Sequence, residues 1–225
     1  MVFLLIHSPL VSPGSWRLVA EELSRHNVVA VTPDLDGDES IGQPLWQQHA
    51  QAAAEAFRGL PPHERPVLVG HSGAGSLLPA IRQAASRPVA GYLFVDAGLP
   101  DGNHARMAIG EGDFAEQLQQ IYAAGRRYPD WTEEMLRDVV PEPERRRQLI
   151  SELRPQPFRF WQETVPVFEG WPDAPCGYLR FLTNPAYEGP ASEAVARGWP
   201  LREIAGDHFH MLVDPAAVAR AIVSP

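Results

Sequence analysis

The stretch VLVGHSGAG, residues 67–75, decides how the rest of the chain is interpreted. The run Val67–Gly70 is short and apolar, as expected for a strand that is buried on both faces. Ser72 follows this run directly, and apolar residues at helical spacing over 77–81 predict a helix immediately afterwards. The sequence therefore predicts a sharp turn from a strand into a helix, with a serine at the turn.

Strands and helices alternate along most of the chain. Further short apolar runs predict strands at Val2–Ile6, Val28–Val31, Gly91–Val95, Gly177–Phe181 and Pro200–Ile204. Amphipathic stretches between them predict helices over residues 16–23, 46–57 and 77–81, and a last helix begins at Asp214 and Pro215. This alternation predicts an α/β fold with a mainly parallel, doubly wound sheet of about six strands, covered by helices on both faces.

One segment, residues 101–175, interrupts the alternation. It contains a helical face over Phe114–Ile121 but no convincing strand, and we interpret it as a helical cap inserted into a core formed by residues 1–100 and 176–225. Because no linker or repeat divides the chain, we expect a single domain over residues 1–225. The cap aromatics either line an apolar pocket or form the core of the cap itself: Trp131, Phe158, Phe160, Trp161, Phe168 and Trp171.

Composition excludes several classes of partner. The net charge of −9 disfavours binding to nucleic acid or to an anionic membrane. Cys176 is the only cysteine, so neither an intramolecular disulfide nor a cysteine-rich metal site is possible. No apolar run approaches the roughly 20 residues of a transmembrane helix, and the first run is too short for a signal peptide. We therefore expect a soluble cytoplasmic protein that acts on a small molecule without a metal or organic cofactor. The sequence does not indicate an oligomeric state.

The strand, Ser72 and the following helix resemble the nucleophile elbow of the α/β-hydrolase family, whose pattern is G-x-S-x-G. Gly70 and Ala74 occupy the two positions where small residues let strand and helix cross. A glycine-rich phosphate loop is the alternative, but the lysine of a P-loop is missing. The resemblance covers residues 2–100 and 176–225, and it implies the α/β-hydrolase fold with Ser72 as a nucleophile.

The same resemblance implies a histidine after the last strand. The stretch IAGDHFH, residues 204–210, is similar to the G-x-H-F segment of many α/β hydrolases. It implies His208 as the base that activates Ser72, with His210 as the second choice. His71, which directly precedes the nucleophile, is interpreted as part of the pocket wall.

Two residues compete for the carboxylate that orients the histidine. Most family members place this acid after the strand before last, which points to Glu188. Some members, the haloalkane dehalogenases among them, place it one strand earlier, and the segment FVDAGLP, residues 94–100, resembles that arrangement through Asp96. Glu188 lies only 20 residues before His208, which is short for the family. The sequence leaves both candidates open.

The oxyanion hole departs from the family pattern. The family combines the backbone N–H of the residue after the nucleophile, here Gly73, with an N–H from the loop after the first strand. That loop begins His-Gly-X in the family and His7-Ser8-Pro9 here, so Pro9 stands where the donor is expected. Proline has no N–H. Either Leu10 donates in its place or the hole is weakened.

These residues predict an enzyme. The leading hypothesis is a serine hydrolase that cleaves an ester, thioester, lactone or amide through an acyl-enzyme on Ser72. The departure from the family's oxyanion-hole pattern leaves a second hypothesis open, in which the same residues perform the acid–base chemistry of a lyase, a cyclase or a carbon–carbon cleaving enzyme. A ligand-binding protein on the same scaffold is the third, because fold alone does not fix function.

Overall fold

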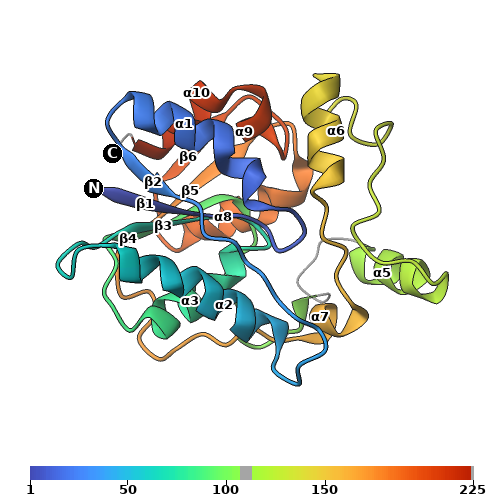
Figure 1. Ribbon diagram of the computed structural model, residues 1–225, viewed down its shortest axis with the longest axis horizontal. Helices are drawn as coiled ribbons and strands as arrows, with labels where there is room; N and C mark the ends of the chain where they lie inside the picture. The colour runs from blue at the N-terminus through green and yellow to red at the C-terminus, as the bar shows by residue number, and fades with distance from the viewer. Residues whose placement is uncertain (107–112, 224–225) are drawn as a thin grey trace.

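The computed structural model describes residues 1–106 and 113–223. Over these residues, six parallel strands form one sheet in the order β2-β1-β3-β4-β5-β6 (Figure 1). The strands are β1 (Val2–Ile6), β2 (Val29–Val31), β3 (Val67–Ser72), β4 (Gly91–Ala97), β5 (Cys176–Phe181) and β6 (Leu201–Ile204). The predicted parallel α/β sheet is confirmed.

Helices cover both faces of the sheet. Figure 1 shows α1 (Arg17–Arg25), α9 (His210–Val213) and α10 (Pro215–Val223) on one face. The opposite face carries α2 (Leu45–Glu55) and α3 (Leu78–Ala85). A further helix, α8 (Glu188–Ala196), packs against β5 and was not expected from the sequence.

Strand β1 shows why its sequence is apolar throughout. Phe3 and Leu5 pack into a core with α1 and α10, whereas Leu4 and Ile6 pack into the core formed with α2 and α3. Neighbouring strand residues point to opposite faces, so a strand between two helical layers needs apolar residues at every position. All five residues of β1 are buried.

The helices of the predicted cap segment lie beyond the carboxyl ends of the strands (Figure 1), whereas its last residues return to the start of β4. Its helices are α5 (Phe114–Ala123), α6 (Pro143–Ser151) and α7 (Phe158–Gln162), while residues 107–112 of this segment lie outside the described residues. Leu118, Phe160 and Trp161 form a small core with Leu10 and Leu45, which ties the segment to the loops at the end of the sheet.

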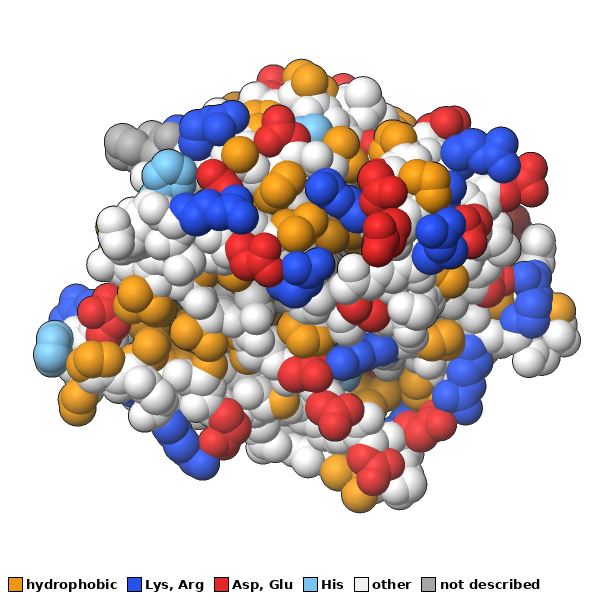
Figure 2. Space-filling model, turned by 45° about the horizontal axis from the view of Figure 1, so that its top comes forward, with side chains coloured by type: hydrophobic (Ala, Val, Ile, Leu, Met, Phe, Trp, Pro, Cys, Tyr) orange, Lys and Arg blue, Asp and Glu red, His pale blue; other side chains and the backbone are white. Residues whose placement is uncertain are grey.

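The surface is mixed in character. On the face shown in Figure 2, acidic and basic side chains are interspersed rather than gathered into patches of one sign. Within the described part of the chain, no helix is long and apolar enough to cross a membrane.

Candidate active site

Ser72 stands at the turn between β3 and the helices that follow. Its φ of 57° lies in the left-handed region, where a residue with a side chain is strained. The 3-10 helix η3 (Gly75–Leu77) leads directly into α3. A Cβ atom at Gly75 would lie 2.1 Å from the backbone oxygen of Gly98, so only glycine fits at this crossing. This is the strand–turn–helix geometry that a nucleophile elbow requires.

A chain of hydrogen bonds links Ser72 to two other strand ends. Nε2 of His208, which follows β6, lies 3.0 Å from Oγ of Ser72, and Nδ1 of the same ring lies 2.8 Å from Oδ2 of Asp96 in β4. A carboxylate beside Nδ1 favours the tautomer with the proton on that nitrogen, which leaves Nε2 as an acceptor. The arrangement can therefore transfer the hydroxyl proton of Ser72 to His208.

Asp96 reaches His208 because β4 carries an extra residue beside the nucleophile. Val95 pairs with His71 and Ala97 pairs with Ser72, so Asp96 stands between two paired positions. Its φ of 43° is left-handed. Extra residues of this kind bend a strand and turn one side chain to a new direction, often next to active sites.

Three donors hold the Asp96 carboxylate, which is completely buried. His208 shares Oδ2 with the side-chain amide of Asn184, whose nitrogen lies 2.8 Å away. The backbone N–H of Phe181 donates to Oδ1 at 3.2 Å. Since a buried carboxylate without partners is very unfavourable, these bonds allow Asp96 to be buried and fix its orientation.

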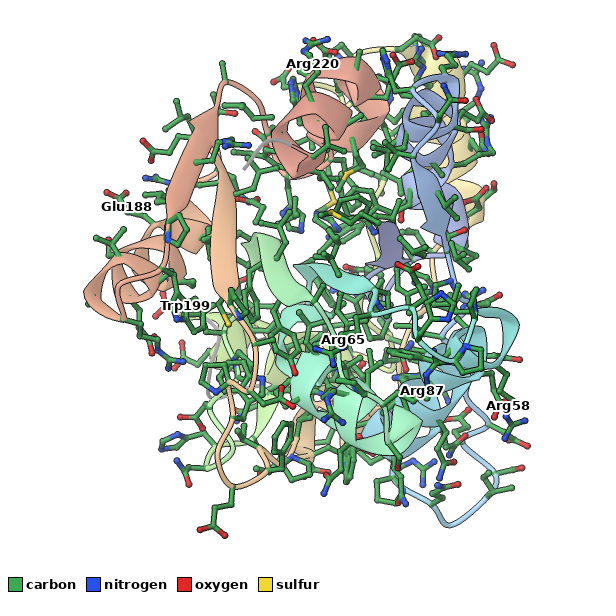
Figure 3. All side chains as sticks on the ribbon, turned by 90° about the vertical axis from the view of Figure 1, so that its left-hand side faces the viewer. Arg58, Arg65, Arg87, Glu188, Trp199 and Arg220 are labelled. Carbon is green, nitrogen blue, oxygen red and sulfur yellow. The ribbon has the colours of Figure 1, made fainter. Side chains whose placement is uncertain are left out.

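The other candidate acid, Glu188, lies at the surface. It is the first residue of α8, its side chain is 66% exposed, and its Oε2 lies 3.5 Å from a guanidinium nitrogen of Arg180. Figure 3 shows it at the outer edge of the molecule. The helix that begins at Glu188 was not predicted from the sequence, and it carries this side chain outwards. Asp96, and not Glu188, is the carboxylate beside His208.

His71 lies beneath the site, so its assignment to the pocket wall is wrong. Consecutive strand residues point to opposite faces, and His71 therefore points into the core rather than towards the pocket. Its ring packs 4.5 Å from that of His208 between centroids, and its Nε2 lies 2.8 Å from the backbone oxygen of His208. Burial lowers the pKa of His71 well below its ordinary value, so the ring is neutral and supports the loop that carries His208.

The second-choice base, His210, is also displaced from the nucleophile. It begins α9, and its ring packs edge-on against Phe181 with 5.7 Å between the centroids. A turn at Gly206 brings the backbone so close that a Cβ there would lie 2.3 Å from the His210 ring. Of the two histidines after β6, His208 is the one that contacts Ser72.

A buried histidine fixes the loop after β1. Nε2 of His7 accepts a hydrogen bond from the backbone N–H of Leu35 at 3.0 Å, so the ring proton is on Nδ1. Nδ1 then donates to the backbone oxygen of Ser8 at 2.8 Å. Burial lowers the pKa of His7 to about 4, so the ring stays neutral and keeps this pattern.

Within this loop, Ser8 lies next to the amide that the sequence offers as a donor. The backbone N–H of Leu10, one of the two open alternatives for the oxyanion hole, donates to Oγ of Ser8 at 3.3 Å. Oγ of Ser8 lies 3.7 Å from the position that a Cβ on Gly73 would take. Among the described residues, nothing accepts the hydroxyl proton of Ser8. One feature of the sequence marks this residue, a serine at the position where the family has glycine.

Tyr187 is a further neighbour of the nucleophile that the sequence did not indicate. Its hydroxyl oxygen lies 3.1 Å from Oγ of Ser72, and its ring stacks on the His208 imidazole with 5.0 Å between centroids. Tyr187 ends the short 3-10 helix η4 (Pro185–Tyr187), which Asn184 caps by accepting the N–H of Ala186. An Asn-Pro pair shortly after the end of a strand is the local signal for such a turn.

A pocket of about 780 Å³ opens beside Ser72. Its wall is mostly apolar and contains three of the predicted cap aromatics, Trp131, Phe160 and Trp161, together with Pro9 and Leu10. Trp171, by contrast, packs against aromatic residues of the sheet core. Among the residues that the structure describes, no group of three or more His, Cys, Asp or Glu side chains is placed to hold a metal ion.

Several solved structures share the fold of this protein over nearly the whole chain. An extracellular α/β-hydrolase from a Paenibacillus species, described as sharing homology with tobacco salicylic acid binding protein 2, superposes with a TM-score of 0.83 at 19% identity, covering 99% of this chain and 98% of its own. Polyneuridine aldehyde esterase gives 0.75 at 18% identity, with 99% and 97% covered. A methylesterase from Arabidopsis gives 0.73 at 17% identity, with the same shares covered.

Sequence comparison gives the family. None of the curated proteins matches the chain. The family model described as the alpha/beta hydrolase family, however, matches residues 3–221, which include the sheet, the elbow and the segment at the end of the strands. The chain therefore belongs to the alpha/beta hydrolase family.

Proposed function

We propose that the protein is a serine hydrolase that cleaves a carboxylic ester of a small, partly apolar substrate through an acyl-enzyme on Ser72. The observation that carries this proposal is the hydrogen-bonded series Ser72, His208 and Asp96 at the mouth of an apolar pocket. The similar solved structures named as esterases support the choice of an ester over a thioester, lactone or amide.

The first step is attack on the ester carbonyl. Oγ of Ser72 forms a bond to the carbonyl carbon while its proton passes to Nε2 of His208, 3.0 Å away. Asp96 holds Nδ1 of the ring and stabilises the imidazolium that forms. The carbonyl π electrons move to the oxygen, which becomes the oxyanion of a tetrahedral intermediate.

Two hydrogen-bond donors stabilise this oxyanion. One is the backbone N–H of Gly73, the residue after the nucleophile. The other is the hydroxyl of Ser8, because Pro9 has no N–H and the amide of Leu10 is bound to Ser8 itself. Each such donor contributes about 10²–10³ to the rate of acyl transfer.

The second step releases the products. The intermediate collapses to an acyl-Ser72 ester, and His208 gives its proton to the departing alkoxide, which leaves as an alcohol. Water then attacks the acyl carbon, with His208 as base again, and the acid leaves while Ser72 recovers its proton. The low polarity of the pocket wall strengthens each charge interaction during these steps.

An activated serine is tested with a reactive phosphonate. We expect the intact mass of the wild type to rise by one phosphonyl group, and Ser72→Ala to remain unlabelled. Turnover of short p-nitrophenyl esters should fall by about 10⁶-fold in Ser72→Ala. Ser151→Ala is the matched control, because this exposed serine lies on α6 and, among the described residues, its hydroxyl hydrogen-bonds only the backbone oxygen of Gln148. A wild type that neither reacts with the phosphonate nor cleaves esters would contradict the proposal.

One observation favours a second candidate function. The Tyr187 hydroxyl beside Ser72 can hydrogen-bond an oxygen of a bound substrate, as a lyase or carbon–carbon cleaving enzyme requires. In that reaction His208 and Asp96 move a proton and Ser72 only positions the substrate. Such an enzyme would lose activity in His208→Gln but retain much of it in Ser72→Ala, whereas a hydrolase loses activity in both.

A further inference from the structure

Arg106 lies in the wall of the pocket that contains Ser72. Its backbone is fixed, because its N–H donates to the backbone oxygen of Glu163 at 3.1 Å and its neighbour Ala105 forms a β-bridge with Thr164. The residue is only 8% exposed. Burial lowers the pKa of its guanidinium to about 10, so the group is still charged at neutral pH.

The guanidinium is poorly partnered for a buried cation. Nη1 donates to the neutral hydroxyl of Ser76 over a long 3.3 Å, and the plane packs 4.3 Å above the centre of the Phe160 ring. Nε and Nη2 have no hydrogen-bond partner among the described residues. These two nitrogens form one edge of the guanidinium, and their parallel N–H bonds match the two oxygens of a carboxylate.

The acidic group next to Arg106 is already engaged. The two carboxylate oxygens of Glu163 accept the backbone N–H groups of Leu45 and Trp46, at 2.7 and 2.9 Å, at the start of α2. Glu163 therefore stabilises the N-terminus of a helix. Within the described ranges 1–106 and 113–223, no carboxylate oxygen lies within ion-pair distance of Arg106.

The other acidic groups of the pocket wall have their own partners. Asp101 accepts from Nδ1 of His104 at 2.9 Å, and Glu193 pairs with Arg197 one helical turn later. Among the described residues, the ion pairs of these two carboxylates are with His104 and Arg197, and neither carboxylate pairs with Arg106. Glu163 attracts the guanidinium from a distance, but among the described residues no carboxylate is hydrogen-bonded to Arg106, whose Nε and Nη2 stay without a partner in a mostly apolar pocket.

From this we infer that Arg106 binds a carboxylate of the substrate, so that the ester cleaved at Ser72 carries a second, free carboxylate, as in the half-ester of a dicarboxylic acid. The inference rests on the proposed function and adds the substrate class to it. Nε and Nη2 are shielded from solvent, so binding requires the guanidinium to turn into the pocket. The single long bond to Ser76 is weak enough to be exchanged for a two-pronged bond to a carboxylate.

Binding to the inactive Ser72→Ala variant tests this without turnover. The probes are the monomethyl and dimethyl esters of succinic, glutaric and adipic acid. Calorimetry measures the affinity of each ester. For one of the three diacids, we expect the monomethyl ester to bind roughly 10- to 100-fold more tightly than the dimethyl ester, because a hydrogen-bonded ion pair replaces neutral contacts. Ser72→Ala/Arg106→Met should lose this ratio, and Arg106→Lys should keep part of it. Equal affinity for the two esters at every chain length would overturn the inference.

Stability separates a binding role from a structural one. If Arg106 serves to bind a ligand, Arg106→Met removes a buried charge that has no hydrogen-bonded carboxylate among the described residues, and it should raise the midpoint of urea unfolding. Removal of an arginine that serves the fold would lower this midpoint instead. Arg58→Met is the matched control, because Arg58 is 80% exposed and points away from the molecule (Figure 3). A lower midpoint in Arg106→Met alone, together with an unchanged ester ratio, would also overturn the inference.

The two proposals fail in different ways. If the protein is not a serine hydrolase, the phosphonate forms no adduct, while the ratio of the affinities for monomethyl and dimethyl esters in Ser72→Ala still tests Arg106. If Arg106 does not bind a carboxylate, a wild type that reacts with the phosphonate has equal kcat/KM for half-ester and diester. This wild-type ratio needs no Arg106 variant, so it decides the question even if Arg106→Met fails to fold.

Discussion

Two regions of the molecule, the series Ser72, His208 and Asp96 at the strand ends and the pocket wall around Arg106, differ in how fully their polar groups are hydrogen-bonded. At the strand ends, the carboxylate of Asp96 accepts three hydrogen bonds, and His208 is held at both ring nitrogens. On the side of α2 and the cap, Nε and Nη2 of Arg106 and Nδ1 of His49 have no partner within the described part of the chain. His49 lies on α2 and is 2% exposed.

This difference distinguishes groups that are held in one orientation from groups that are available to bind a ligand. A fully bonded carboxylate at the end of a sheet is rigid and needs no ligand to complete it, as expected of groups that must stand in one geometry for every turnover. Buried donors without partners are unfavourable on their own and gain most from a ligand that supplies acceptors. In the proposed hydrolase, the strand ends therefore supply the chemistry, and the wall around Arg106 supplies the choice of substrate.

The largest effect should come from breaking the fully bonded side. Asp96→Asn presents an amide where His208 needs a carboxylate, so the ring loses its tautomer and the charge that stabilises the imidazolium. We expect kcat to fall by about 10⁴-fold with little change in KM. Glu188→Gln, on the exposed end of α8, should change kcat less than about twofold. Steady-state kinetics with one ester compare the two variants, and a larger loss in Glu188→Gln would reverse the assignment of the acid.

A smaller effect should come from the loop that faces the nucleophile. Ser8→Ala removes the hydroxyl that we place beside the oxyanion, and kcat should fall by about 10²–10³-fold while KM changes little. Ser8→Thr keeps the hydroxyl and should retain most of the activity, which distinguishes the lost donor from a disturbed loop. If Ser8→Ala is as active as the wild type, the second donor has to be sought elsewhere.

Sequence patterns predicted the strand ends in more detail than the pocket wall around Arg106. The strands, the turn at Ser72 and the position of His208 depend on local periodicity and on short motifs, which a single sequence displays. The choice between Asp96 and Glu188 did not depend on such a pattern. It was decided by an extra residue in β4 and by helix α8, and both reflect how β4, β5 and the chain after them pack together.

The pocket wall around Arg106 depends on contacts between segments that are distant in the sequence. Arg106 meets Ser76 and Phe160, which are 30 and 54 positions away, so its burial has no local signal. Ser8 was visible as an exception to the family's His-Gly pair, but its role became evident only when the amide of Leu10 was found bound to its hydroxyl. Exceptions to a motif are informative about function, although a sequence alone does not say what replaces the missing group.

The smallest expected effect concerns stability on the α2 side. Burial, with the nearby Arg106 charge as a lesser cause, lowers the pKa of His49 from 6.5 to about 3. His49 is therefore neutral in the folded protein but protonated in the unfolded chain below pH 6.5, so stability is complete above that pH and falls as the pH decreases towards 3. Between pH 7 and pH 5 this one group should lower the free energy of unfolding by roughly 2 kcal/mol.

His49→Leu removes the difference in proton binding between the unfolded and the folded state at this position. Urea unfolding at pH 7 and pH 5 should show a smaller loss of stability for His49→Leu than for the wild type, by roughly 2 kcal/mol. The lowered pKa values of His7 and His71 also make the protein less stable as the pH falls, so His49→Leu keeps this part of the pH dependence. His63→Leu is the matched control at an exposed site, and its pH dependence should equal that of the wild type. Identical losses in all three proteins would mean that His49 is already solvated in the folded state, and the α2 side would then be more open than its burial indicates.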